Sequence, residues 1–361
     1  MSLSAEEINR YSRHISLDNV GLEGQLKLKN AKVLVIGSGG LGTPTLLYLT
    51  AAGVGNIGVI DFDVVEESNL QRQVLFSPED IGQSKAIMAQ KKLQKQNPFI
   101  EIIAYNFALT NKNAIELFEK YDIVIDGSDN FNTRYLVNDA CILTDTILIY
   151  GAIYKFEGQV SVFNYQNGPT YRCLFPEAPK KGSVPNCSEV GVIGILPSLI
   201  GSMQASEAIK IIIGIGEISS GKLLIYNSLL SSQTEIMIKR NFSIESIGIH
   251  TNEDLENYSY EEFCIAEENE KTFNSSVKFS EIPVDAFVLD VRDDWEQPRV
   301  EYQNMLIAPL DSINDFANII PKEEDVFVIC QKGGRSQMAI DFLTKEYNFS
   351  NLINVDGGVL G

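Results

Sequence analysis

The sequence predicts an α/β chain of two domains: a large first domain with a doubly wound mixed sheet, and a small α/β domain after it. Short apolar runs alternate with helical stretches in the N-terminal part, which is typical of a doubly wound sheet. The chain has 361 residues, too many for one average domain and enough for two. Between about Thr251 and Ser276 the composition turns acidic and loses any period, as in a solvated linker, with Tyr260, Phe263 and Cys264 as candidate anchors for part of it.

The strands of the first domain are predicted from apolar runs. Lys32–Gly37 comes first, and a run of this kind is buried on both faces of a parallel sheet. A glycine-rich turn and a helix over Thr43–Ala52 follow, and Ile57–Asp61 is the next strand. Asp122–Asp126 and Thr146–Tyr150 are two more. These elements give the parallel part of the sheet.

The remaining elements make the sheet mixed and complete the second domain. Residues 157–165 alternate between polar and apolar like an antiparallel strand, and residues 193–214 form a long buried helix that ends at glycine. Further strands are predicted at Ala286–Val291 and Val326–Cys330, with a helix around Gln337–Lys345. The predicted boundaries are 1–250 for the first domain, 251–278 for the linker and 279–361 for the second domain.

Charge and cysteine content restrict the partners and the compartment. The formal charge of −19 repels phosphate backbones, so nucleic acid is not an expected partner. No apolar segment is long enough to span a bilayer and the N-terminus is polar, so we expect no membrane association and a cytoplasmic location. Scattered, odd-numbered cysteines suit free thiols in a reducing compartment. The five are Cys141, Cys173, Cys187, Cys264 and Cys330.

A phosphate-binding turn is predicted where the first strand meets its helix. The turn carries Gly37, Gly39, Gly40 and Gly42, and glycines there allow a phosphate to approach the helix N-terminus. Asp61 ends the next strand, where a carboxylate accepts hydrogen bonds from ribose hydroxyls. Alone, this pattern also fits a nicotinamide-dependent oxidoreductase, or a turn without any ligand.

The residues that follow decide between these alternatives. Asp61-Phe62-Asp63 is followed by Ser68-Asn69-Leu70-Gln71-Arg72-Gln73, by Lys85 and by Asp129-Asn130. In this order and spacing they resemble the ubiquitin-activating-enzyme-like adenylyltransferases of the ThiF/MoeB/HesA family, in particular those with a C-terminal rhodanese domain. The resemblance covers nearly the whole chain and implies a Rossmann-like adenylation domain that binds ATP.

The resemblance also implies roles for single residues. Arg72 and Lys85 match cations that bind the phosphates, and Asp129 matches a carboxylate that binds Mg²⁺. Asp61 and Asn69 match positions that hold the ribose and orient the nucleotide. Arg13 resembles an arginine that reaches the phosphates of a neighbouring subunit, which implies a homodimer. The expected nucleotide-binding set is Gly37, Gly39, Gly40, Gly42, Asp61, Asp63, Ser68, Asn69, Leu70, Gln71, Arg72, Gln73, Lys85, Asp129 and Asn130.

Cys187 is predicted to be reactive. It lies just ahead of the long apolar helix, and the N-terminus of a helix favours the thiolate form of a cysteine. In the family that the chain resembles, this stretch is a crossover loop whose cysteine links covalently to the carrier or to a sulfur donor. The alternative is a small residue without a role at the end of a loop.

The chain departs from the family at the structural zinc site. Many relatives bind zinc with two CxxC pairs, whereas here Cys173 stands alone in the first region and the second has no cysteine. Because structural zinc takes four nitrogen or sulfur ligands, we predict no zinc. Packing by Ile244 and Ile247 is expected in place of the metal.

Cys330 begins a second reactive loop, which ends at Arg335 and lies between a strand and a helix. Such a loop wraps backbone N–H groups around the sulfur, and an arginine there stabilises an anion. The loop resembles that of rhodaneses, as do Leu289–Arg292 and Asp356–Gly358. Phosphatase loops of similar pattern have one more residue between cysteine and arginine, and an inactive relative is a further alternative.

These observations predict an enzyme with two half-reactions. The first domain would adenylate the C-terminal Gly-Gly carboxylate of a ubiquitin-like sulfur carrier, and a persulfide on Cys330 would convert the adenylate to a thiocarboxylate. A cysteine desulfurase is a suitable persulfide donor, and the pathway would be of the molybdopterin, thiamine or tRNA-thiolation type. The alternatives are an oxidoreductase, a scaffold that retains nucleotide, and an enzyme that adenylates a non-protein carboxylate.

Overall fold

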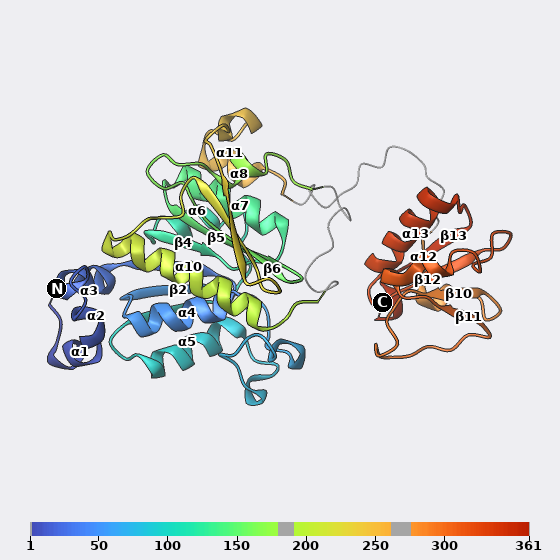
Figure 1. The fold of residues 1–361 in the computed structure, drawn as a ribbon, viewed down its shortest axis with the longest axis horizontal. Helices are drawn as coiled ribbons and strands as arrows, with labels where there is room; N and C mark the ends of the chain where they lie inside the picture. The colour runs from blue at the N-terminus through green and yellow to red at the C-terminus, as the bar shows by residue number, and fades with distance from the viewer. Residues whose placement is uncertain (1, 180–190, 261–275, 361) are drawn as a thin grey trace. The chain divides into compact units, whose positions relative to one another are not determined.

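The computed structural model describes residues 2–179, 191–260 and 276–360 (Figure 1). The described residues up to Tyr260 belong to one compact unit, and those from Ser276 belong to a second. Within these ranges no helix has the length and apolar character needed to cross a membrane.

The first unit is built on one sheet of eight strands, in the order β3-β2-β1-β4-β5-β6-β7-β8. The strands from β3 to β5 in this order are parallel, and β6, β7 and β8 are antiparallel. The predicted mixed sheet is therefore confirmed. The bounds are β1 Lys32–Ile36, β2 Asn56–Ile60, β3 Glu101–Tyr105, β4 Ile123–Asp126, β5 Ile147–Tyr154, β6 Glu157–Phe163, β7 Lys222–Asn227 and β8 Ser232–Met237.

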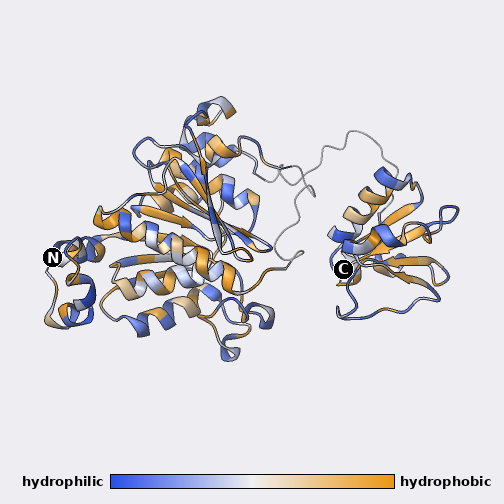
Figure 2. Ribbon diagram, in the orientation of Figure 1, coloured by the Kyte–Doolittle hydropathy of each residue, from blue (hydrophilic) through white to orange (hydrophobic). Residues whose placement is uncertain are grey.

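Helices cover both faces of the parallel strands. Val33 and Val35 of β1 lie in a core shared with α4, α5 and α10, whereas Leu34 and Ile36 face α6 and α7. Between their ends the parallel strands are mainly apolar, as a sheet covered on two sides requires (Figure 2). The helices are α1 Ala5–Arg10, α2 Ser12–Ile15, α3 Gly21–Asn30, α4 Gly42–Ala52, α5 Lys85–Gln96, α6 Ala114–Phe118, α7 Phe131–Leu143, α8 Tyr171–Leu174, α10 Ile195–Ile213 and α11 Asn252–Asn257.

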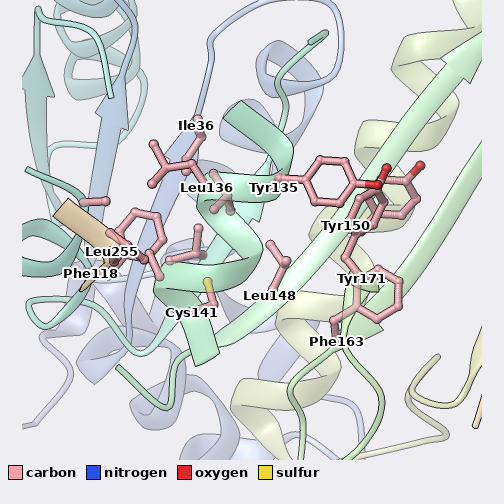
Figure 3. Close-up of a cluster of buried hydrophobic side chains, with 14 of the residues drawn as sticks. Ile36, Phe118, Tyr135, Leu136, Cys141, Leu148, Tyr150, Phe163, Tyr171 and Leu255 are labelled. Carbon is pink, nitrogen blue, oxygen red and sulfur yellow. The ribbon is translucent and has the colours of Figure 1, made fainter. Parts of the chain in front are cut away.

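Aromatic rings join α7 and α8 to the sheet (Figure 3). The centroid of Tyr171 lies 5.1 Å from that of Tyr135 and 5.3 Å from that of Tyr150, and Phe163 packs beside them. The Tyr135 hydroxyl also contacts the carbonyl oxygens of Phe175 and Glu177, at 3.0 and 2.7 Å. This cluster therefore fixes the chain that leaves α8.

The predicted linker, 251–278, is wrong at both ends. Residues 251–260 pack on the first unit, with Leu255 of α11 fully buried and the Tyr260 hydroxyl donating to Asp139 Oδ2 at 2.9 Å. At the other end Ser276–Lys278 is strand β9 and pairs with β13. The burial of Leu255 and Tyr260 attaches residues 251–260 to the first unit, although the segment has the acidic composition of a linker.

Tyr260 completes a buried ionic network near Cys173, in the region where many members of the family bind zinc. Asp139 pairs with Arg172 through both carboxylate oxygens, at 2.8 and 2.7 Å, and neither side chain is more than 2% exposed. Cys173 is also buried, and Ile244 packs in the same core with Ile247 against it. Burial alone would raise the pKa of Cys173, but hydrogen bonds from the Thr170 hydroxyl and from backbone N–H groups lower it. The absence of zinc stays a prediction.

Tyr260→Phe is expected to lower the free energy of unfolding by about 1–2 kcal/mol, because Asp139 then loses one donor while it stays buried. Urea unfolding followed by circular dichroism measures this change. Tyr154→Phe removes a hydroxyl from a side chain that is 43% exposed and is expected to have no effect. Equal stability of the two variants would show that Tyr260 does not hold residues 251–260 in place.

The second unit has a sheet of five parallel strands, in the order β11-β10-β12-β13-β9. Leu289, Val326 and Val328 face a core shared with α13, and Val288 and Phe327 belong to a smaller cluster. The bounds are β9 Ser276–Lys278, β10 Phe287–Asp290, β11 Asn304–Ile307, β12 Val326–Ile329, β13 Leu352–Asp356, α12 Ile313–Phe316 and α13 Gly334–Tyr347.

Candidate functional site

A pocket of about 560 Å³ lies at the carboxyl ends of β1, β2 and β4 in the first unit. Ligands of open α/β sheets bind at this edge, where the turns after the strands meet. The turn after β1, the segment from Asp61 to Gln73 and the turn after β4 all contribute to its lining. These segments carry most of the predicted nucleotide-binding residues.

Close backbone contacts and hydrogen bonds to Asp61 fix the conformation of the turn after β1. Gly37 has a φ of +82°, and a Cβ on Gly42 would lie 1.8 Å from the carbonyl oxygen of Gly37. Asp61 Oδ2 accepts hydrogen bonds from the backbone N–H and hydroxyl of Ser38, at 2.8 and 2.9 Å. Asp61 Oδ1 accepts from the N–H of Asp63. Asp61 therefore fastens the turn, a role that the sequence did not predict, and the ribose contact stays a prediction.

Gly42→Ala is expected to lower the free energy of unfolding by about 3 kcal/mol, because the new methyl group cannot fit against Gly37 without moving the turn. Urea unfolding tests this expectation. Gly39→Ala is the matched control, because its nearest neighbour would be the Gln73 amide nitrogen at 3.7 Å, an ordinary contact. A Gly42→Ala chain as stable as the control would contradict the packing described for the turn.

Two cations face the pocket beside this turn. Arg72 Nη1 donates to the carbonyl oxygen of Ser68 at 2.9 Å, and its side chain passes close to Gly40. Lys85 begins α5, is only 6% exposed, and pairs with Asp63 at 3.1 Å. Both line the pocket, so two positive charges flank the position where a phosphate would meet the glycine turn.

The turn after β4 presents Asp129, which is exposed and lines the pocket. Buried polar groups hold this turn. Asp126 Oδ1 accepts from the Ser128 N–H at 2.9 Å, Arg134 donates to the Ser128 carbonyl oxygen at 3.2 Å, and Gln204 donates to the Asp126 carbonyl oxygen at 2.7 Å. Burial raises the pKa of Asp126, although Arg134 beside it acts in the opposite direction. These three supporting residues were not predicted from the sequence.

The pocket brings together most of the predicted residues but not all. Gly42 and Leu70 do not line it, and Asn130 lines it while capping α7 by accepting from the Thr133 N–H. Arg13 is exposed on α2 and does not line the pocket of its own chain. Cys187 lies outside the described residues. The predicted residues that line it are Gly37, Gly39, Gly40, Asp61, Asp63, Ser68, Asn69, Gln71, Arg72, Gln73, Lys85, Asp129 and Asn130.

An apolar wall of the pocket was missed. Phe107 and Leu109 follow β3, and Phe62, Val64 and Ile153 line the same cavity. Single apolar residues in connecting segments give no periodic signal, so the sequence offered no means to find them. A planar, partly apolar ligand such as a nucleobase suits this wall next to a phosphate-binding turn.

Among the described residues, a buried polar atom without a hydrogen-bond partner belongs to a residue that lines the pocket. Side chains rarely leave such atoms unpaired, because each one costs about 1–3 kcal/mol. The atom is Gln73 Oε1. This oxygen can accept a hydrogen bond from a polar ligand.

The second unit places Cys330 in a tight loop between β12 and α13. Cys330 is 1% exposed, and its sulfur accepts a hydrogen bond from the Gly333 N–H at 3.1 Å. Ser336 Oγ lies 3.4 Å from the sulfur. A Cβ on Gly358 would lie 2.3 Å from the Cys330 carbonyl oxygen, so the chain after β13 closes tightly over the loop.

Comparisons with known proteins agree with this geometry. Residues 11–244 match the ThiF family. The chain is 41% identical to the "Probable adenylyltransferase/sulfurtransferase MoeZ" of Mycobacterium tuberculosis, over 99% of this chain and 93% of that protein. It is 49% identical to the sulfur carrier protein adenylyltransferase of Thermus thermophilus, over 73% of this chain and 99% of that protein. The crystal structure of E. coli MccB with ATP is similar at a TM-score of 0.58 and 25% identity, over 66% of this chain and 73% of that one.

Proposed function

The chain belongs to the ThiF family, and we propose that it adenylates the C-terminal Gly-Gly carboxylate of a ubiquitin-like sulfur carrier with ATP and then transfers sulfur to it. The observation that carries the proposal is the convergence of Arg72, Lys85 and Asp129 on one glycine turn. Relatives named as adenylyltransferase and sulfurtransferase, similar over almost the whole chain, support both half-reactions.

In the first half-reaction a carboxylate oxygen of the carrier attacks the α-phosphorus of ATP. A new O–P bond forms, the bond to the β-phosphate oxygen breaks, and pyrophosphate leaves with the electron pair. Arg72 and Lys85 would neutralise the charge that develops along the phosphates, in a partly buried pocket where such charges interact strongly. The residues around the turn therefore bind and orient the phosphates and need no covalent role.

A magnesium ion suits the carboxylate of Asp129. Mg²⁺ typically takes one or two protein carboxylates and completes its shell with phosphate oxygens and water, and Asp129 presents such a group on the pocket wall. When bound, the ion would polarise the phosphates and screen their charge. Asp129 would hold the ion at the carboxyl end of β4, on a turn that Asp126 and Arg134 fix through hydrogen bonds to the Ser128 backbone.

In the second half-reaction the terminal sulfur of a Cys330 persulfide attacks the adenylated carbonyl carbon. A C–S bond forms, the C–O bond to AMP breaks, and AMP leaves. A thiolate, with Cys187 as the candidate, then attacks the Cys330 sulfur. The thiocarboxylate leaves, and a disulfide remains between the two cysteines. A thiol reductant reduces this disulfide and restores both thiols. The Gly333 N–H donates to the Cys330 sulfur at 3.1 Å and helps to hold it in the loop.

The partners follow from the same chemistry. A cysteine desulfurase is a suitable source of the persulfide, because it forms one on its own cysteine. A homodimer would let Arg13 of one copy reach the phosphates of the other, since Arg13 does not line the pocket of its own chain. A cytoplasmic location suits the free thiols that both steps use.

ATP–pyrophosphate exchange tests the proposal. The full chain is expected to exchange pyrophosphate only with a carrier that has an intact Gly-Gly tail, and mass spectrometry should detect the adenylate and the thiocarboxylate. A carrier without the tail is the control. Exchange with a small carboxylate alone would favour the non-protein substrate. Oxidation of a nicotinamide without exchange would favour the oxidoreductase, and nucleotide binding without exchange would favour a scaffold.

A further inference from the structure

Arg335, the arginine that ends the Cys330 loop, is already engaged by a carboxylate. Its two terminal nitrogens pair with the two oxygens of Glu296, at 2.7 and 2.5 Å. Glu296 is buried, and the Arg335 side chain is 17% exposed. A bidentate pair of this kind fixes the plane of the guanidinium as well as its position. Arg335 is therefore not a free cation at the sulfur.

Further contacts fasten Glu296 to the loop. Glu296 Oε1 accepts from the Asp293 N–H at 2.9 Å, and Gln331, which follows Cys330, donates to the Gln297 carbonyl oxygen at 2.9 Å. Burial alone would raise the pKa of Glu296, but the hydrogen bonds from Arg335 and the Asp293 N–H lower it overall. The carboxylate is thus held in its charged form on a segment that is itself attached to the loop.

The other charged groups around the loop do not replace Arg335. Arg292 pairs with Asp290, both fully buried, and Arg299 lies 3.6 Å from the same carboxylate. Lys332 within the loop and Asp356 at the end of β13 are exposed, and water screens both of these charges. Asp293 is half-buried and adds a second negative charge near Arg335. Arg292 also reaches the loop, through Gln331 Oε1 at 3.4 Å, but its charge is already paired with Asp290, so Arg335 and Glu296 form the charged pair that joins α13 to the segment facing it.

We propose that Glu296 is a positioning and specificity residue, which holds Arg335 at the loop and cancels its charge. The sulfur of Cys330 then depends on backbone N–H groups for stabilisation, and small anionic sulfur donors gain no attraction from Arg335. The arrangement therefore gives a small anionic donor no electrostatic advantage over the protein-borne persulfide of the proposed function. The choice of donor rests on the proposed function, whereas the electrostatic role of Glu296 does not.

Alkylation with two reagents that differ in charge tests the electrostatic role. Iodoacetate is anionic and iodoacetamide is neutral, so the ratio of their rates at Cys330, read by peptide mass spectrometry, reports the local potential. Glu296→Gln keeps the shape of the side chain and removes its charge. It is expected to raise the iodoacetate-to-iodoacetamide ratio about fivefold, the effect of one unit charge about 4 Å away at the dielectric constant of water. A general loss of structure would change both rates together and leave the ratio unaltered.

Glu346→Gln is the matched control, because Glu346 lies on the exposed far end of α13 and pairs with Lys345 at 3.6 Å. Its ratio should equal that of the wild type. Arg335→Gln leaves the carboxylate without its partner and is expected to lower the ratio, which keeps the test usable if Glu296→Gln does not fold. An unchanged ratio in both Glu296→Gln and Arg335→Gln would overturn the proposal.

Sulfur transfer from thiosulfate supplies the specificity test. The Cys330 thiolate attacks the outer sulfur of thiosulfate, an S–S bond forms, and sulfite leaves with the electron pair of the broken bond. Glu296→Gln is expected to lower the KM for thiosulfate about fivefold. An unchanged KM alongside the altered alkylation ratio would overturn the donor specificity alone. A wild-type chain with no transfer from any donor, but with the expected ratio, would count against the proposed function and not against the role of Glu296.

Discussion

Asp129→Ala is expected to reduce carrier-dependent ATP–pyrophosphate exchange by roughly a thousandfold. The side chain lines the pocket beside the glycine turn and is exposed, so its removal takes away a charged ligand and leaves the packing of the turn intact. Asp126, Arg134 and Gln204 would still hold the turn in place. The expected loss is therefore chemical and not structural.

Asp122→Asn is the control for this substitution. Asp122 precedes the same strand at its other end, and its carboxylate accepts from the Lys32 N–H at 2.9 Å, away from the pocket. Its exchange rate should stay near that of the wild type, and both variants should unfold at the wild-type urea concentration. Normal exchange by Asp129→Ala would remove Asp129 from the reaction and, with it, the proposed magnesium site.

The parts of the site that the sequence predicted are those encoded locally. The turn at Gly37–Gly42 follows from a strand, a glycine cluster and a helix that are adjacent in the chain. Arg72 and Lys85 were identified through a family resemblance and not from spacing alone, because a single cation carries no signal of its role. The structure adds what neither source supplied, the hydrogen bonds by which Asp61 fastens the turn through Ser38.

The missed parts depend on contacts between distant segments. Gln204 supports the turn after β4 from a helix 78 residues away in the chain, and Tyr260 binds Asp139 from 121 residues away. The acidic composition predicts a linker over residues 251–260. Tyr260 is a candidate anchor in the sequence, but its acceptor Asp139 and the burial of Leu255 depend on contacts that composition does not show. Glu296 was likewise indistinguishable in sequence from the acidic residues around it.

Cys330→Ser is expected to separate the two half-reactions. The hydroxyl cannot carry a sulfane sulfur, so thiocarboxylate formation should fall by roughly a thousandfold or more, whereas pyrophosphate exchange should stay at the wild-type rate. Serine is close to cysteine in size, and Cys330 sits in a loop shaped by the Gly333 N–H and the Gly358 backbone, so the substitution should preserve the fold. Mass spectrometry of the carrier after incubation with ATP and a persulfide donor measures both products.

The informative result is an adenylated carrier that accumulates in Cys330→Ser. Each unit would then perform one step, because a defect confined to the second unit would leave an intermediate made by the first. Cys264→Ser, at a cysteine outside the described residues with no assigned role, is the control and should form thiocarboxylate normally. Thiocarboxylate formed at the wild-type rate by Cys330→Ser would mean that sulfur reaches the adenylate without this loop, and the second unit would then need another role.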